Sequence, residues 1–77
     1  MPIEYKKNLA VFRDVVSVDE AEALLEWLQK KSTARVDLSN CIHMHPANLQ
    51  VLMAANTVIS AWPADTVFAT WLRSALI

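Results

Sequence analysis

Glycine is absent from the 77 residues of this chain. Glycine-rich phosphate loops need positions without a Cβ where the backbone approaches the phosphate, so the Rossmann and P-loop fingerprints are both excluded. Nucleotide chemistry carried by this chain alone is therefore a poor hypothesis. Cysteine occurs only once, as Cys41, which rules out an internal disulfide and suits a reducing cytoplasm.

Long apolar runs are missing as well. No run approaches the ~18 residues that a membrane span needs, and the N-terminal residues lack the pattern of a signal peptide. The formal net charge of −1 argues against a basic surface for nucleic acid and against a polybasic membrane patch. We therefore expect a cytoplasmic protein that binds no nucleic acid and does not insert into membranes.

Apolar residues are abundant and charges are unevenly distributed. Hydrophobic residues make up 55% of the chain, which argues against disorder, and a chain this short buries about 60% of its surface in one thin core. We expect a single domain over residues 1–77. The formal charges of residues 36–77 are only Asp37, Asp65 and Arg73. So long a charge-poor stretch cannot be wholly buried, and we expect an apolar patch or a partner that covers it.

Short apolar segments predict three strands, at residues 9–13, 34–38 and 58–62. The second of these strands is expected to end at Asp37 and Leu38, because the turn-prone pair Ser39-Asn40 follows. In this interpretation Asp37 holds the loop that comes next.

Helical spacing of apolar residues predicts a first helix over residues 18–31, with Ser17 and Glu20 forming a capping box. A second helix is expected from Pro46 to Asn56, mostly enclosed because it contains few polar residues. The alternation of strands and helices predicts an α/β fold, with a mixed or mostly parallel sheet of three or four strands and three helices. The helices should cover one face of this sheet better than the other.

The last helix is expected to follow Pro63, with Asp65 or Thr66 as its cap. Its apolar face, expected to pack on the sheet, consists of Val67, Phe68, Trp71, Leu72 and Ala75. Trp71 is therefore assigned to the core. Trp27 lies beside the stripe of its own helix, which makes it the better candidate for a partly exposed anchor.

The segment from Val36 to Leu52 reads Val-Asp-Leu-Ser-Asn-Cys-Ile-His-Met-His-Pro-Ala-Asn-Leu-Gln-Val-Leu. It resembles the signature of the STAS domain, the fold of the anti-sigma-factor antagonists. In that family a strand ending in Asp-Leu-Ser leads to an Asp-Ser-Ser-Gly-Leu turn that opens a helix. The order of elements agrees over residues 9–76, although the N-terminal part is shorter than the family's usual opening hairpin. The resemblance implies a small STAS-like domain with a regulatory, non-catalytic role in protein–protein interaction.

Aligned on Leu49, the aspartate of the family motif falls on His45 and its first serine on Pro46. The second serine, which accepts phosphate from a partner kinase, falls on Ala47, and the glycine falls on Asn48. Alanine has no hydroxyl, so a phosphorylation switch cannot operate at this position. What the resemblance then implies is a docking surface without phosphate control, formed by His43, Met44, His45, Pro46, Ala47, Asn48, Leu49 and Gln50.

Within this surface, Asn48 and Gln50 are expected to supply hydrogen bonds, and Met44 and Leu49 to act as apolar anchors. The partners that the resemblance implies are a kinase-like or sigma-regulating protein, or the ATPase of a transporter. A second copy of the chain is another possible partner. No cofactor is expected.

Cys41, His43 and His45 support an alternative, a small metal- or ligand-binding module. In an extended chain these three side chains point the same way, and thiolate and imidazole are ligands for zinc and copper. Three ligands within five residues, without a second pair, match no standard spacing. A Cys/His nucleophilic pair would need a geometry that the sequence does not supply, so we expect no enzyme. A helper subunit of a larger enzyme is a third possibility.

Overall fold

The computed structural model describes residues 2–31 and 33–76. Its elements are β1 (Ile3–Tyr5), β2 (Leu9–Val16), the short 3-10 helix η1 (Val18–Glu20), α1 (Ala21–Lys30), β3 (Arg35–Met44), α2 (Pro46–Ala55), β4 (Val58–Ala61) and α3 (Thr66–Leu76). The strands form one sheet in the order β1-β2-β3-β4, antiparallel between β1 and β2 and parallel from there on. The predicted α/β fold, with a mixed sheet and three helices, is confirmed.

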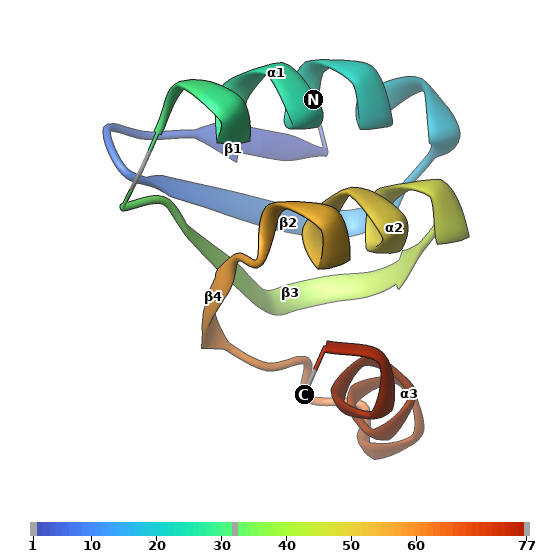
Figure 1. Ribbon diagram of the computed structural model, residues 1–77. Helices are drawn as coiled ribbons and strands as arrows, with labels where there is room; N and C mark the ends of the chain where they lie inside the picture. Colours follow the sequence, from blue (N-terminus) through green and yellow to red (C-terminus); the bar gives the residue numbers. More distant parts are fainter. Residues whose placement is uncertain (1, 32, 77) are drawn as a thin grey trace.

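The helices are unevenly placed around this sheet, as the alternation of elements predicted. α1 and α2 lie side by side on one face (Figure 1). β4 pairs only with Arg35–Asp37 of β3, and α3 lies near the carboxyl end of β3 instead. The opposite face carries polar side chains, such as Arg13, whose guanidinium donates to the Glu4 carboxylate at 2.7 Å.

One hydrophobic core lies between the sheet and the helices. Its fully buried side chains come from the strands and from all three α-helices: Ile3, Phe12, Val16, Leu24, Val36, Leu38, Met44, Leu52 and Leu72. Trp27 is half-buried and its ring lies 5.3 Å from that of Tyr5, so it packs against this core while remaining partly exposed. No helix of the described residues is long and apolar enough to span a membrane.

The start of the first helix differs from the prediction. Val18–Glu20 form η1, and α1 begins only at Ala21. The side chain of Ser17 makes no capping hydrogen bond; instead its backbone carbonyl accepts from the Glu20 N–H at 3.2 Å. The capping box is therefore wrong, because the tighter 3-10 turn satisfies these groups through the backbone.

The second helix is not enclosed. α2 buries Asn48, Leu49 and Leu52, whereas Met53 is 50% exposed and Ala54 and Ala55 are also exposed. Its C-terminus forms where predicted, because Asn56 takes the left-handed conformation (φ 54°, ψ 47°) that asparagine tolerates well.

The last helix is capped as predicted but rotated from its expected orientation. Asp65 Oδ1 accepts from the Phe68 N–H at 3.0 Å and caps α3. The buried residues are Ala69 and Leu72, while Val67 is 79% exposed and Trp71 42% exposed. The assignment of Trp71 to the core is therefore wrong. The helix packs through a neighbouring stripe, against the core at the edge of the sheet rather than flat on its face.

Candidate protein-contact surface

β3 is twice as long as predicted, and its irregular pairing decides which side chains reach the surface. Ser39 and Asn40 lie inside the strand, so Asp37 does not precede a loop. The register with β2 shifts between Asp37 and Asn40 and again between Cys41 and His43. Such bulges insert extra residues, which the sequence alternation does not reveal.

Asp37 stabilises the first of these bulges. Its Oδ1 accepts from the Ser39 N–H at 2.9 Å and from the Ser39 hydroxyl at 2.7 Å. These hydrogen bonds favour the ionised carboxylate and lower the pKa of Asp37 below its ordinary value. The prediction that Asp37 holds a loop is therefore wrong, because its hydrogen bonds to Ser39 lie within β3.

The second bulge separates the three candidate metal ligands. Cys41 is buried in the core, whereas His43 and His45 are exposed. The Cys41 thiol donates to the His43 carbonyl at 3.5 Å, and burial raises its pKa to about 11, so the thiolate is disfavoured. Within residues 2–31 and 33–76, no group of three His, Cys, Asp or Glu side chains could hold a metal ion. The expectation that these three side chains point the same way is wrong.

His45 closes the start of α2. Its backbone is extended (φ −64°, ψ 141°), and its Nδ1 accepts from the Ala47 N–H at 3.0 Å. The His45 carbonyl accepts from the Asn48 N–H at 2.9 Å, and Pro46 has no N–H. The first three residues of α2 therefore leave no free N–H group, although free N–H groups are what an anion at a helix start requires.

Three of the eight predicted surface residues belong to the interior. Met44 and Asn48 are fully buried and Leu49 is 7% exposed, so none of them can contact a partner. The Asn48 Nδ2 donates to the carbonyls of Val16 at 3.4 Å and Ser17 at 2.8 Å, which attaches α2 to the end of β2. The hydrogen bonds predicted for Asn48 and the apolar anchors predicted at Met44 and Leu49 are in fact internal contacts.

The other five predicted residues remain accessible. His43, His45, Pro46 and Gln50 are exposed, and Ala47 is half-buried. Pro46 and Gln50 lie one turn apart on α2, and the same outward stripe continues to Met53. We call Pro46, Gln50 and Met53 the α2 stripe. Met53 was missed by the sequence analysis, although its spacing from Pro46 and Gln50 follows the helical repeat.

A shallow groove of about 380 Å³ lies beside the carboxyl end of β3. It is lined by Ile42, His43, Asp65, Val67, Phe68 and Trp71. The ring of Phe68 lies between those of His43 and Trp71, with centroid distances of 6.4 and 6.0 Å. Among these residues, only His43 was predicted to be part of a site. The others were missed because the sequence does not show that α3 lies beside the end of β3.

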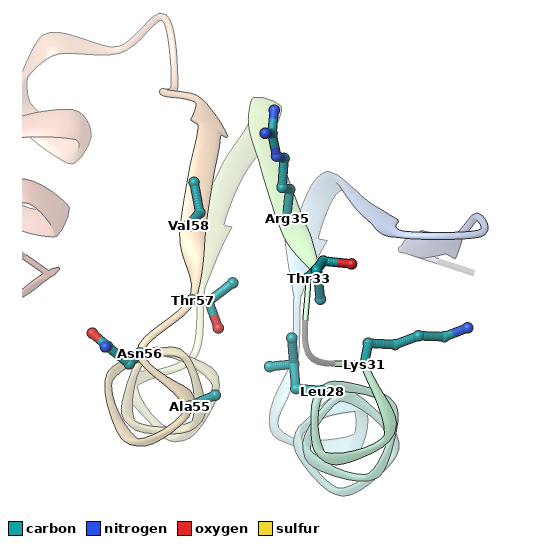
Figure 2. A pocket seen from close by; sticks show the side chains of 9 residues that line it. Leu28, Lys31, Thr33, Arg35, Ala55, Asn56, Thr57 and Val58 are labelled. Carbon is teal, nitrogen blue, oxygen red and sulfur yellow. The ribbon is translucent and has the colours of Figure 1, made fainter.

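A second cavity, of about 250 Å³, lies at the opposite end of the sheet. It is lined by Leu28, Lys31, Thr33, Ala34, Arg35, Ala55, Asn56, Thr57 and Val58. In Figure 2 the side chains of Lys31 and Arg35 extend away from Leu28. This cavity lies at the end of the sheet where β3 and β4 begin. In parallel sheets, ligands bind at the other end, beside the carboxyl ends of the strands, so the cavity is not at the usual position of a ligand site.

No protein-family model matches this chain, and no curated protein sequence matches it either.

Proposed function

We propose that this chain is a non-catalytic regulatory domain that acts by binding another protein, as the STAS-like segment Val36–Leu52 implies. The antiparallel hairpin of β1 and β2 that opens the sheet supports the comparison, because the family also begins with a hairpin. We place its action in the cytoplasm. The partner classes are those of the resemblance: a kinase-like or sigma-regulating protein, or the ATPase of a transporter.

The observation that carries this proposal is the exposed α2 stripe at the end of the STAS-like segment. The helix has no charged residue, and Met53 presents half of its surface to solvent. Gln50 places an amide with both donors and an acceptor beside it. A flexible thioether flanked by an amide suits a protein surface of mixed character, in which the methionine is the apolar anchor.

Binding in this proposal is independent of phosphorylation at the helix start. Ala47 offers no hydroxyl, and its N–H is already bonded to His45 Nδ1. A phosphate placed there would have to displace His45 to reach N–H donors. The affinity for the partner is therefore constitutive, set by the contact surface itself.

Affinity capture from the native cell, compared between variants, tests this proposal. Met53→Glu places a charge in the α2 stripe and should abolish capture of the partner, because the charge would be buried unpaired at the interface. Val18→Glu is the matched control, since Val18 is also 50% exposed but lies on η1. Capture of the same proteins by both variants would refute a contact through α2.

A further inference from the structure

The outward face of α3 is exposed and carries no charge. It consists of Val67, Thr70, Trp71 and Ser74, which we call the α3 stripe. Val67 and Trp71 are the exposed apolar members. The stripe adjoins the groove of about 380 Å³, because both residues also line it.

The two hydroxyl groups of the α3 stripe are already satisfied. Thr70 Oγ1 donates to the Thr66 carbonyl at 2.7 Å, and Ser74 Oγ donates to the Trp71 carbonyl at 2.8 Å. Burying a hydroxyl costs free energy mainly when its hydrogen bond is lost, so both can be covered by an apolar partner at little cost. Their small side chains also allow a second helix to approach closely. In contrast, the α2 stripe contains the Gln50 amide, for which no internal hydrogen bond is found within the described residues.

Charged side chains border the α3 stripe but do not enter it. The Arg73 guanidinium lies 5.2 Å from the centre of the Trp62 ring, and the Asp65 carboxylate caps α3. Both charges are therefore engaged within the chain. A twofold contact brings a surface against its own copy, so any charge near the axis meets a like charge. The α3 stripe carries no charge, so two copies of it can meet across a twofold axis without this repulsion.

We propose that two copies of this chain associate through their α3 stripes, with the two helices antiparallel across a twofold axis near Thr70 and Trp71. The stripe from Val67 to Ser74 extends about 10 Å along the helix axis, from the rise of 1.5 Å per residue. In the antiparallel arrangement, Val67 of one copy lies near Ser74 of the other copy. The groove at the flank of each stripe provides space for apolar side chains of the second copy. This self-association is separate from the proposed contact of α2 with a different protein.

Sedimentation equilibrium of the purified chain, from low micromolar to near-millimolar concentration, tests the proposal. We expect a monomer–dimer equilibrium, and Val67→Glu should weaken association at least about tenfold, because it buries an unpaired charge within the contact. Val67 is 79% exposed, so the substitution should leave the fold intact. Met53→Glu, on the α2 stripe, is the matched control and should dimerise like the unmodified chain.

The symmetry is tested by cross-linking. In a Cys41→Ser background, Thr70→Cys should form an intermolecular disulfide rapidly on oxidation, because the axis places this residue near its own copy. Gln50→Cys, on α2, should do so only slowly.

A monomer at every concentration would overturn the proposal, as would a dimer that survives Val67→Glu or dissociates with Met53→Glu. A third outcome is that the chain is monomeric and binds a different protein, and that Val67→Glu abolishes this binding. This outcome would assign the α3 stripe to that protein instead. The proposed function fails separately, when Met53→Glu leaves partner capture unchanged.

Discussion

Asn48 connects α2 to the end of β2 through its side-chain amide. The residue is fully buried, and its Nδ2 serves the carbonyls of Val16 and Ser17. A buried amide in this position stabilises the junction at which the STAS-like segment meets the first half of the chain. Removing it costs each carbonyl one of two donors, because Val16 O also accepts from the His45 N–H at 2.8 Å and Ser17 O from the Glu20 N–H at 3.2 Å.

We therefore expect Asn48→Ala to lower the free energy of unfolding by about 1 kcal/mol, because the two hydrogen bonds that the buried amide donates are lost. Urea unfolding followed by tryptophan fluorescence measures this change. Gln50→Ala is the control and should stay within about 0.5 kcal/mol, as is usual for exposed positions. Unchanged stability of Asn48→Ala, with weaker partner binding, would restore the residue to the docking surface.

Cys41 should be an unreactive thiol in the folded protein. Burial raises its pKa to about 11, so the thiolate that reacts with iodoacetamide is scarce at neutral pH. We expect alkylation in native buffer to be far slower than in urea, and to accelerate until the pH reaches about 11. Equal rates in the two solvents would show that the thiol is accessible.

The same pKa predicts how stability depends on alkaline pH. A pKa that is raised on folding contributes stability that is fully present below the unfolded value of about 8.5 and is lost as the pH rises toward 11. Cys41→Val should abolish this part of the pH dependence, because it retains an apolar side chain without the thiol.

At the level of elements, the start of α2 depends on His45. The imidazole Nδ1 takes the place that an asparagine or serine oxygen commonly has at an N-cap. Because Pro46 has no N–H and Asn48 bonds to the His45 carbonyl, the cap completes the hydrogen bonds of the first turn. A phosphate at this end of the helix would have to displace His45 to reach an N–H donor.

His45→Ala should lower the free energy of unfolding by about 1 kcal/mol, whereas His45→Asn should restore most of the loss, because its side-chain oxygen can accept the same bond. Thermal unfolding followed by circular dichroism compares the two variants. If both are equally unstable, the contribution of His45 does not come from the cap.

α2, β4 and β3 show what periodicity can and cannot predict about elements. The strand at Val58–Ala61 and the helix that begins at Pro46 form where apolar spacing and proline chemistry place them. β3 continues through Ser39-Asn40 because pairing with β2 and the Asp37 side chain stabilise residues that prefer turns when isolated.

At the scale of the whole molecule, α3 is held to the rest of the chain through Leu72. This side chain is fully buried in the core that it shares with α2 and β3. The opposite side of the helix presents the α3 stripe to solvent. Stability and association thus depend on different faces of one helix.

Leu72→Ala should therefore lower the free energy of unfolding by about 3 kcal/mol, because it leaves a cavity in the core. Val67→Glu should change it by less than about 0.5 kcal/mol in the monomer. Urea unfolding at a low protein concentration measures both, and a large effect of Val67→Glu there would mean that the side chain is buried within the chain.

The sequence by itself determined the class of fold, because alternating apolar segments bounded by proline and asparagine specify strands and helices locally. It also determined that Ala47 cannot carry a phosphate, because this follows from the side chain alone. Only the tertiary structure decided which residues face solvent: Met44, Asn48 and Leu49 lie inside, and Met53, Val67 and Trp71 outside. Orientation depends on bulges and on the rotation of a helix against the core, and both are set by contacts between residues far apart in the chain.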